Sequence, residues 1–286
     1  MAAVTVAHVL SAILLLTISA LALILSLRQT RHRQMHTPAN PADFRAGIRE
    51  KYARQFALHR EVAERLEEVI SARRQLPSHV HVALDMLMTQ AYKTHLAVRL
   101  LAERAQAEDA ATMTRRLMEL GIQAVYIGCD DDVEVTASRA GCYLAWIWRS
   151  APDELHRHVP EAARQEWQKL VDDYGPQLPK ARRWGPSFRD MFEAAGLLDA
   201  YEQDYTLLSA IAHGSARDLA LHYAMPIINL RSDMHVPALL IFASRYYLSV
   251  ADAWNRHFTR IDPAVYNRLL DSVVELRDEE LNLPAK

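Results

Sequence analysis

A long apolar run opens the chain, from Val4 to Leu27, and it contains no Asp, Glu, Lys or Arg. A helix needs about 20 apolar residues to cross the hydrocarbon core of a bilayer, so this run is long enough. A secretory signal peptide would need a basic start, a shorter apolar core and a cleavage site of small residues. Here the start, MAAVTVAH, has no Lys or Arg, and the run ends in Ser26-Leu27-Arg28. The sequence therefore predicts a permanent transmembrane anchor over residues 1–27, which contacts the membrane through residues 4–27.

Basic residues flank this run on one side only. Arg28, Arg31 and Arg33 follow it, and no Lys or Arg precedes it. The positive-inside rule places the basic flank of a membrane helix in the cytoplasm. We therefore expect a single-pass inner (plasma) membrane protein whose N-terminus faces out and whose residues 28–286 form a soluble domain on the cytoplasmic side.

The rest of the chain has the composition of a helical bundle. It contains few glycines, 8 in the 286 residues, whereas strand-rich folds with many tight turns usually need more. No segment alternates between apolar and polar residues over several positions, as a half-buried strand would. Instead, apolar residues recur about every fourth position, as at Phe44, Ile48, Tyr52 and Phe56, which is typical of a helix with one buried face.

These patterns predict an all-α fold in which a single N-terminal transmembrane helix precedes a multi-helix bundle. Residues 28–40 form a polar linker, and residues 41–286 form the helical domain. Ser187 and the pair Asp262-Pro263 are helix-start signals, and Gly196 is a helix-stop signal. The predicted helices cover residues 41–74, 80–127, 133–148, 153–173, 187–196, 198–213, 215–223, 236–258 and 262–281, with irregular segments over 174–187 and 225–232.

Composition and motifs argue against several classes of function. The net charge of -2 and the pI near 6.7 give no global attraction to nucleic acid. The two cysteines, Cys129 and Cys142, are too few for a disulfide framework, and their separation does not match a zinc ligand pair. The chain has no H-E-x-x-H or C-x-x-C motif and neither of the common glycine-rich nucleotide-binding loops. We therefore predict no metal and no cofactor.

The sharpest local pattern is Tyr205-x3-Ser209-x3-His213-Gly214. Residues four apart lie on one face of a helix, so the phenol, the hydroxyl and the imidazole line up. Gly214 ends the helix directly after the histidine, and the helix dipole favours the charged form of a histidine at that end. This pattern indicates either a catalytic or ligand-binding histidine, or a buried histidine that fastens the helix to its neighbour. The second interpretation is preferred on sequence alone.

A second pattern, Arg115-x3-Glu119, lies in the middle of the predicted helix over 80–127, with Arg116 beside it. Arginine and glutamate at this spacing form an intrahelical pair worth about 0.2–0.5 kcal/mol when it is exposed. A solvated charged face is the default interpretation. If the two side chains instead point into a bundle, they need partners, and Ser209 or His213 would be natural ones.

The two patterns together resemble a known family. The segment TRRLMELGIQAVYI, residues 114–127, and the later segment YEQDYTLLSAIAHGS, residues 201–215, resemble the bacterial family called domain of unknown function 5677. That family is similar in having an R-x-x-x-E helix and a later Y-x-x-x-S-x-x-x-H element, and the likeness covers about residues 80–225. It implies a shared helical core and brings no established reaction. The resemblance makes five positions candidate catalytic residues: Arg115, Glu119, Tyr205, Ser209 and His213.

A different comparison is with all-helical ribonucleases of the HEPN type, whose motif places an arginine shortly before a histidine. Such a pair suits RNA cleavage, because histidine moves the 2′-hydroxyl proton and arginine holds the phosphate. Arg217-x4-His222 and Arg54-x4-His59 both fit, but about four such matches are expected by chance among 13 histidines. His213 itself has no arginine five to seven residues before it.

Two functions therefore stay open, and the sequence does not decide whether the domain is an enzyme. The first is a membrane-anchored cytoplasmic helical domain that binds a protein partner or a second copy of itself, or senses a signal. In this case Arg115, Glu119, Ser209 and His213 would form a buried polar network. The second is a HEPN-like ribonuclease effector in stress or phage defence, with His213 or His222 acting beside an arginine. RNA is a partner only under this second hypothesis.

Overall fold

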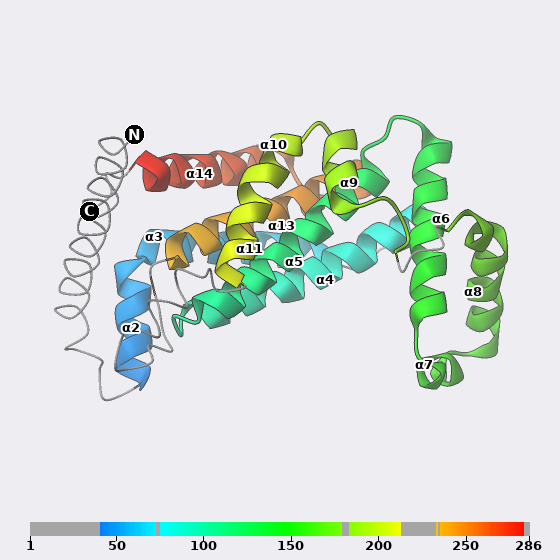
Figure 1. The fold of residues 1–286 in the computed structure, drawn as a ribbon, viewed down its shortest axis with the longest axis horizontal. Helices are drawn as coiled ribbons and strands as arrows, with labels where there is room; N and C mark the ends of the chain where they lie inside the picture. The colour runs from blue at the N-terminus through cyan, green and yellow to red at the C-terminus, as the bar shows by residue number, and fades with distance from the viewer. Residues whose placement is uncertain (1–40, 73–74, 179–182, 213–232, 234, 283–286) are drawn as a thin grey trace, which may run out of the picture. The chain divides into compact units, whose positions relative to one another are not determined.

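A computed structural model describes residues 41–72, 75–178, 183–212, 233 and 235–282. Every regular element among these residues is helical, which confirms the all-α prediction for this part of the chain (Figure 1). The chain forms two compact units, residues 1–47 and 48–286. In the first unit the described residues belong to the start of α2 (Pro41–Lys51).

The membrane part of the predicted fold needs correction. No helix in the described part of the chain combines the length and the apolar composition that a membrane crossing requires. The predicted span itself, residues 4–27, lies outside the described residues. The described helices therefore give no support to the predicted N-terminal transmembrane helix, nor to the single-pass inner-membrane location that depended on that helix.

Three long helices form the centre of the second unit. Each of them packs against the other two (Figure 1). They are α4 (His79–Ala102), α5 (Ala107–Gly128) and α13 (Val236–Phe258). Gly121 lets two of them approach closely, because a Cβ atom there would lie 3.3 Å from the backbone oxygen of Tyr246. α13 is apolar around most of its circumference, which is typical of a helix surrounded by others.

The remaining helices cover this centre from different sides. Two of them pack against α13 and against each other: α3 (Ala53–Ile70) and α14 (Pro263–Asn282). α6 (Val133–Ser150) packs on α4 and α5, and α8 (Glu161–Tyr174) packs on α6, on the side away from the central helices (Figure 1). The short elements are α7 (Asp153–His158), η1 (Gly175–Gln177), α9 (Phe188–Ala194), α10 (Leu198–Ala200), the π-helix η2 (Tyr201–Tyr205) and α11 (Thr206–Ala212).

Four predicted helices are interrupted in the structure, and the one predicted over 198–213 contains the π-helix η2. The helix predicted over 80–127 is two helices, α4 and α5, and between them Ala105 adopts a left-handed backbone conformation with φ of 53°. The helix predicted over 41–74 breaks at Tyr52, whose ψ is 36°. The helix predicted over 153–173 breaks before Pro160, because a proline disfavours helical backbone in the residue before it.

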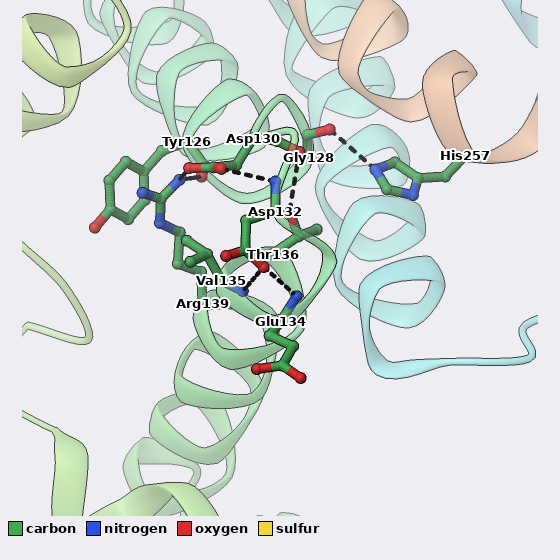
Figure 2. A network of polar contacts seen from close by, with 9 residues as sticks. All are labelled: Tyr126, Gly128, Asp130, Asp132, Glu134, Val135, Thr136, Arg139 and His257. Carbon is green, nitrogen blue, oxygen red and sulfur yellow. Dashed lines mark hydrogen bonds and ion pairs between the residues drawn. The ribbon is translucent and has the colours of Figure 1, made fainter.

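The connection between α5 and α6 is held by its acidic residues (Figure 2). The Asp132 carboxylate accepts hydrogen bonds from the backbone amides of Glu134 and Val135, and so caps the N-terminus of α6. Asp130 pairs with Arg139 at 3.0 Å, and the same arginine donates to the backbone oxygen of Tyr126 at 2.7 Å. The acidic residues therefore stabilise the connection between α5 and α6.

Replacing Asp132 by alanine should lower the free energy of unfolding by about 1 kcal/mol, because the first amides of α6 lose their capping acceptor. Urea denaturation at neutral pH measures this change. The matched control is Asp131→Ala, since Asp131 is exposed and makes no capping bond. Its effect should stay within about 0.5 kcal/mol. An equal loss for both variants would show that the cap contributes nothing.

Candidate functional site

The α5 side of the candidate site is an ion-pair cluster on one helical face. The Nε atom of Arg115 donates to Glu119 Oε1 at 3.3 Å, and Nη1 of Arg116 donates to Glu119 Oε2 at 3.3 Å. Only 14% of the Glu119 side chain is exposed, against 28% for Arg115 and 47% for Arg116. Both carboxylate oxygens of Glu119 therefore face a guanidinium group, and the spacing of four residues produces the intrahelical pair that it predicts.

The opposite side of the site comes from η2 and α11, and α11 packs against α5 (Figure 1). The guanidinium carbon of Arg115 lies 4.9 Å from the ring centroid of Tyr205, which is a cation–π contact. The Tyr205 ring also stacks on Tyr201, with centroids 4.8 Å apart. Burial raises the pKa of Tyr205, and the positive charge of Arg115 opposes that rise. The structure thus brings Arg115, Glu119 and Tyr205 together.

The other two candidate residues have different outcomes. Ser209 lies one helical turn beyond Tyr205, and its hydroxyl oxygen is buried with no hydrogen-bond partner among the described residues. His213 lies outside the described residues, as do Arg217 and His222. The catalytic role predicted for these five residues therefore stays a prediction. Of those within the described part of the chain, the structure shows contacts only among Arg115, Glu119 and Tyr205.

The second ribonuclease-like match, Arg54 and His59, does not form a site. Arg54 is at the surface, where Nη1 donates to Glu279 of α14 at 2.6 Å. His59 is fully buried against α4. The two side chains therefore point into different environments, and the arginine cannot hold a phosphate beside this histidine.

A buried carboxylate next to the site was not predicted from the sequence. Asp204 belongs to η2, and its Oδ2 atom accepts hydrogen bonds from Arg245 Nη1 at 2.9 Å and from the Tyr246 hydroxyl. Both donors lie on α13. Burial first, and the Asp204 charge second, raise the pKa of Tyr246. A sequence signal did exist, because Arg245 is the one charged residue in the apolar stretch PALLIFASRYYLSVA of α13.

A further contact fixes the loop that precedes α9. The Gln123 side chain donates to the backbone oxygen of Glu119 at 2.9 Å and accepts a hydrogen bond from Trp184 Nε1 at 3.1 Å. The Trp184 ring is buried and meets Tyr143 edge-on at 5.2 Å. The next turn of α5 after Glu119 therefore holds this loop in place.

Together these contacts define what the site can do chemically. The two carboxylates of the site, the half-buried Glu119 and the buried Asp204, are each held by arginine, so neither is poised as a free general base. Burial raises the pKa of the Cys129 thiol to about 11 and also raises that of Cys142, so both favour the unreactive thiol form. Within the described residues, no group of three or more His, Cys, Asp or Glu side chains is placed to hold a metal ion.

The fold and the site define an all-helical domain whose central helix carries an arginine–glutamate pair that faces a tyrosine from a later helical segment. A family model described as "Family of unknown function (DUF5677)" matches residues 81–225, about half of the chain. The chain belongs to this family, which confirms the resemblance seen in the sequence. The matched range contains the Arg115–Glu119–Tyr205 cluster and Asp204, whereas α3 and α13 lie outside it. No curated protein and no solved structure matches the chain.

Proposed function

We propose that this helical domain is a recognition module that binds a protein partner or a second copy of itself, or senses a signal through such contacts. The observation that carries the proposal is the internal pairing of its candidate site. Glu119 is engaged by two arginines, and the cation of Arg115 lies on the face of Tyr205. Charged groups that are engaged in this way hold α5 against η2.

The same cluster leaves a surface suited to binding. Arg115 and Tyr205 are partly exposed, and Arg116 is more open to solvent than either. Arginine and tyrosine are enriched at the centres of protein interfaces, because both combine a large contact area with directional hydrogen bonding. Their positions are fixed before a partner arrives, so little conformational entropy is lost when it binds.

The alternative function, a HEPN-like ribonuclease, depends on His213 or His222, and both lie outside the described residues. No contact of the described residues favours it. RNA cleavage is therefore one of the results that would contradict the recognition proposal.

The test compares two exposed arginines in the full-length chain. Arg116→Ala removes an arginine from the proposed surface, whereas Arg189→Ala removes one from α9 with a similar helical ion pair and similar exposure. Light scattering measures self-association, and crosslinking in cells followed by mass spectrometry measures partner contacts. Arg116→Ala should weaken the association about tenfold, which is the loss typical of one important interface residue, and Arg189→Ala should leave it unchanged.

Two results would contradict the recognition proposal. One is an equal effect of the two arginine substitutions on every crosslink and on self-association. The other is RNA cleavage by the purified chain that His213→Ala abolishes while circular dichroism and the unfolding midpoint remain those of the wild type.

A further inference from the structure

Two histidine rings are stacked face to face in the core of the second unit. The ring of His59 on α3 and the ring of His95 on α4 have centroids 3.5 Å apart and an interplanar angle of 3°. Tyr247 of α13 lies beside them, with its ring centroid 4.8 Å from that of His95. All three residues have 0% relative exposure. The pair therefore lies where three helices meet.

The polar atoms of this cluster have no hydrogen-bond partners among the described residues. This holds for all four ring nitrogens of His59 and His95 and for the hydroxyl of Tyr247. An unpaired buried polar group costs about 1–3 kcal/mol. A chain that keeps several of them in one place carries a stability cost that an apolar core would avoid. Such a cost calls for an explanation beyond packing.

Protonation of this pair is strongly opposed while the helices are packed. Burial lowers the pKa of His59 to about 3, and the positive charge of Arg99 adds to the effect. The pKa of His95 is also well below its ordinary value, through burial first and then through the charges of His59 and Arg99. Because an imidazolium ring cannot be accommodated here, each histidine stays neutral as long as α3 remains packed on α4 and α13.

The charged groups around the pair come from α3, α4 and α14, whereas α13 contributes the neutral ring of Tyr247. From α4, Arg99 faces both rings and pairs with Glu103 at 3.9 Å. Tyr92, also on α4, interacts with Glu67 of α3, and the same carboxylate acts on Tyr247 of α13. α14 packs on α3, but its ion pairs with that helix, Arg54–Glu279 and Arg268–Glu61, lie at the exposed surface. The fixed charge that acts on both rings is therefore positive, and it opposes their protonation.

We propose that the stacked histidines form an acid-operated latch on α3, so that proton uptake by His59 and His95 releases this helix from α4 and α13. The direction follows from linkage. With α3 packed the pair binds no proton near neutrality, whereas the exposed rings bind protons below a pH of about 6.5. The packed state is therefore fully favoured above that pH and loses stability as the pH falls. Release uncovers the buried apolar face of α3, including Val62 and Leu66, and that face would be available to a partner.

The test is hydrogen exchange of the full-length chain at pH 7 and pH 5, with rates corrected for the intrinsic effect of pH. Each histidine should favour the released state about 25-fold more at pH 5 than at pH 7, so two should lower the protection of residues 53–70 about 600-fold. Peptides from α5 provide the internal reference, and their protection should fall much less. Equal protection of residues 53–70 at the two pH values would overturn the proposal.

The matched variants separate the latch from other acid effects. His59→Phe/His95→Phe keeps two stacked rings and removes the titration, so the protection of residues 53–70 should no longer depend on pH in this range. Each single Phe variant should retain about a 25-fold response, and these variants decide the question if the double variant does not fold. His158→Gln changes an exposed histidine and should behave as the wild type. An undiminished acid response in a folded double or single variant would assign the release to carboxylates instead of the histidines.

Discussion

Replacing Trp254 by alanine is expected to lower the free energy of unfolding by about 3–5 kcal/mol, the range for deleting a large aromatic side chain from a core. Trp254 has 0% relative exposure and lies on α13, which contacts both other central helices. Its ring stacks on Phe258 with centroids 4.2 Å apart, and Nε1 donates to Asp85 of α4 at 3.4 Å. A domain is usually stable by about 5–15 kcal/mol, so this one change removes a large share of the total.

Urea denaturation followed by circular dichroism measures the loss. Trp254→Phe is the matched control, because a smaller ring keeps the stacking on Phe258 and loses only volume and the hydrogen bond to Asp85. The expected order of stability is wild type, then Trp254→Phe, then Trp254→Ala. A loss below about 1 kcal/mol for the alanine variant would mean that the helices around this position collapse into the space.

Helix ends with strong local signals were predictable from the sequence. The predicted helix over 236–258 coincides with α13, and the Asp262-Pro263 pair does start α14, with Asp262 accepting from the Ala264 amide at 2.8 Å. Ser187 forms a reciprocal capping box with Asp190, and Gly196 ends that segment with φ of 69°. In each case the signal is local, because a side chain, or its absence at glycine, determines a helix end only a few residues away.

Breaks without such signals were missed. Ala105 adopts a left-handed backbone although alanine is a strong helix former, and neither glycine nor proline marks the end of α4. The π-helix η2 is likewise made of ordinary residues, YEQDY. Here the packing of whole helices overrides local preference, because α4 must end for α5 to turn back against it and against α13.

Contacts of side chains divide in the same way: a pair within one helix was predictable, whereas contacts between helices were not. The Arg115–Glu119 pair follows from a spacing of four residues, but its contact with Tyr205 was not predicted, because Ser209 and His213 were the expected partners. The His59–His95 stack joins two different helices, and no local pattern links those positions. Long-range contacts of this kind depend on which faces of two helices meet, and a single sequence does not specify that.

The Asp204 carboxylate holds η2 on α13, so removing it should lower the free energy of unfolding. Asp204→Ala leaves the buried Tyr246 hydroxyl without its acceptor and Arg245 without its partner. Breaking a buried ion pair costs about 3–5 kcal/mol, but the Arg245 side chain is 29% exposed and regains some hydration. We therefore expect a loss of about 2–4 kcal/mol in the free energy of unfolding.

A double-mutant cycle with Tyr246→Phe separates the two contacts of Asp204. Tyr246→Phe removes the buried hydroxyl together with its need for an acceptor, so Asp204→Ala should cost less in that background than in the wild type. Asp204→Asn keeps an acceptor oxygen for Tyr246 and should be milder than Asp204→Ala. If Asp204→Ala costs the same in both backgrounds, the tyrosine contributes nothing to holding η2 on α13. Arg245 would then be the contact that keeps the π-helix, and Tyr205 with it, in position beside Arg115.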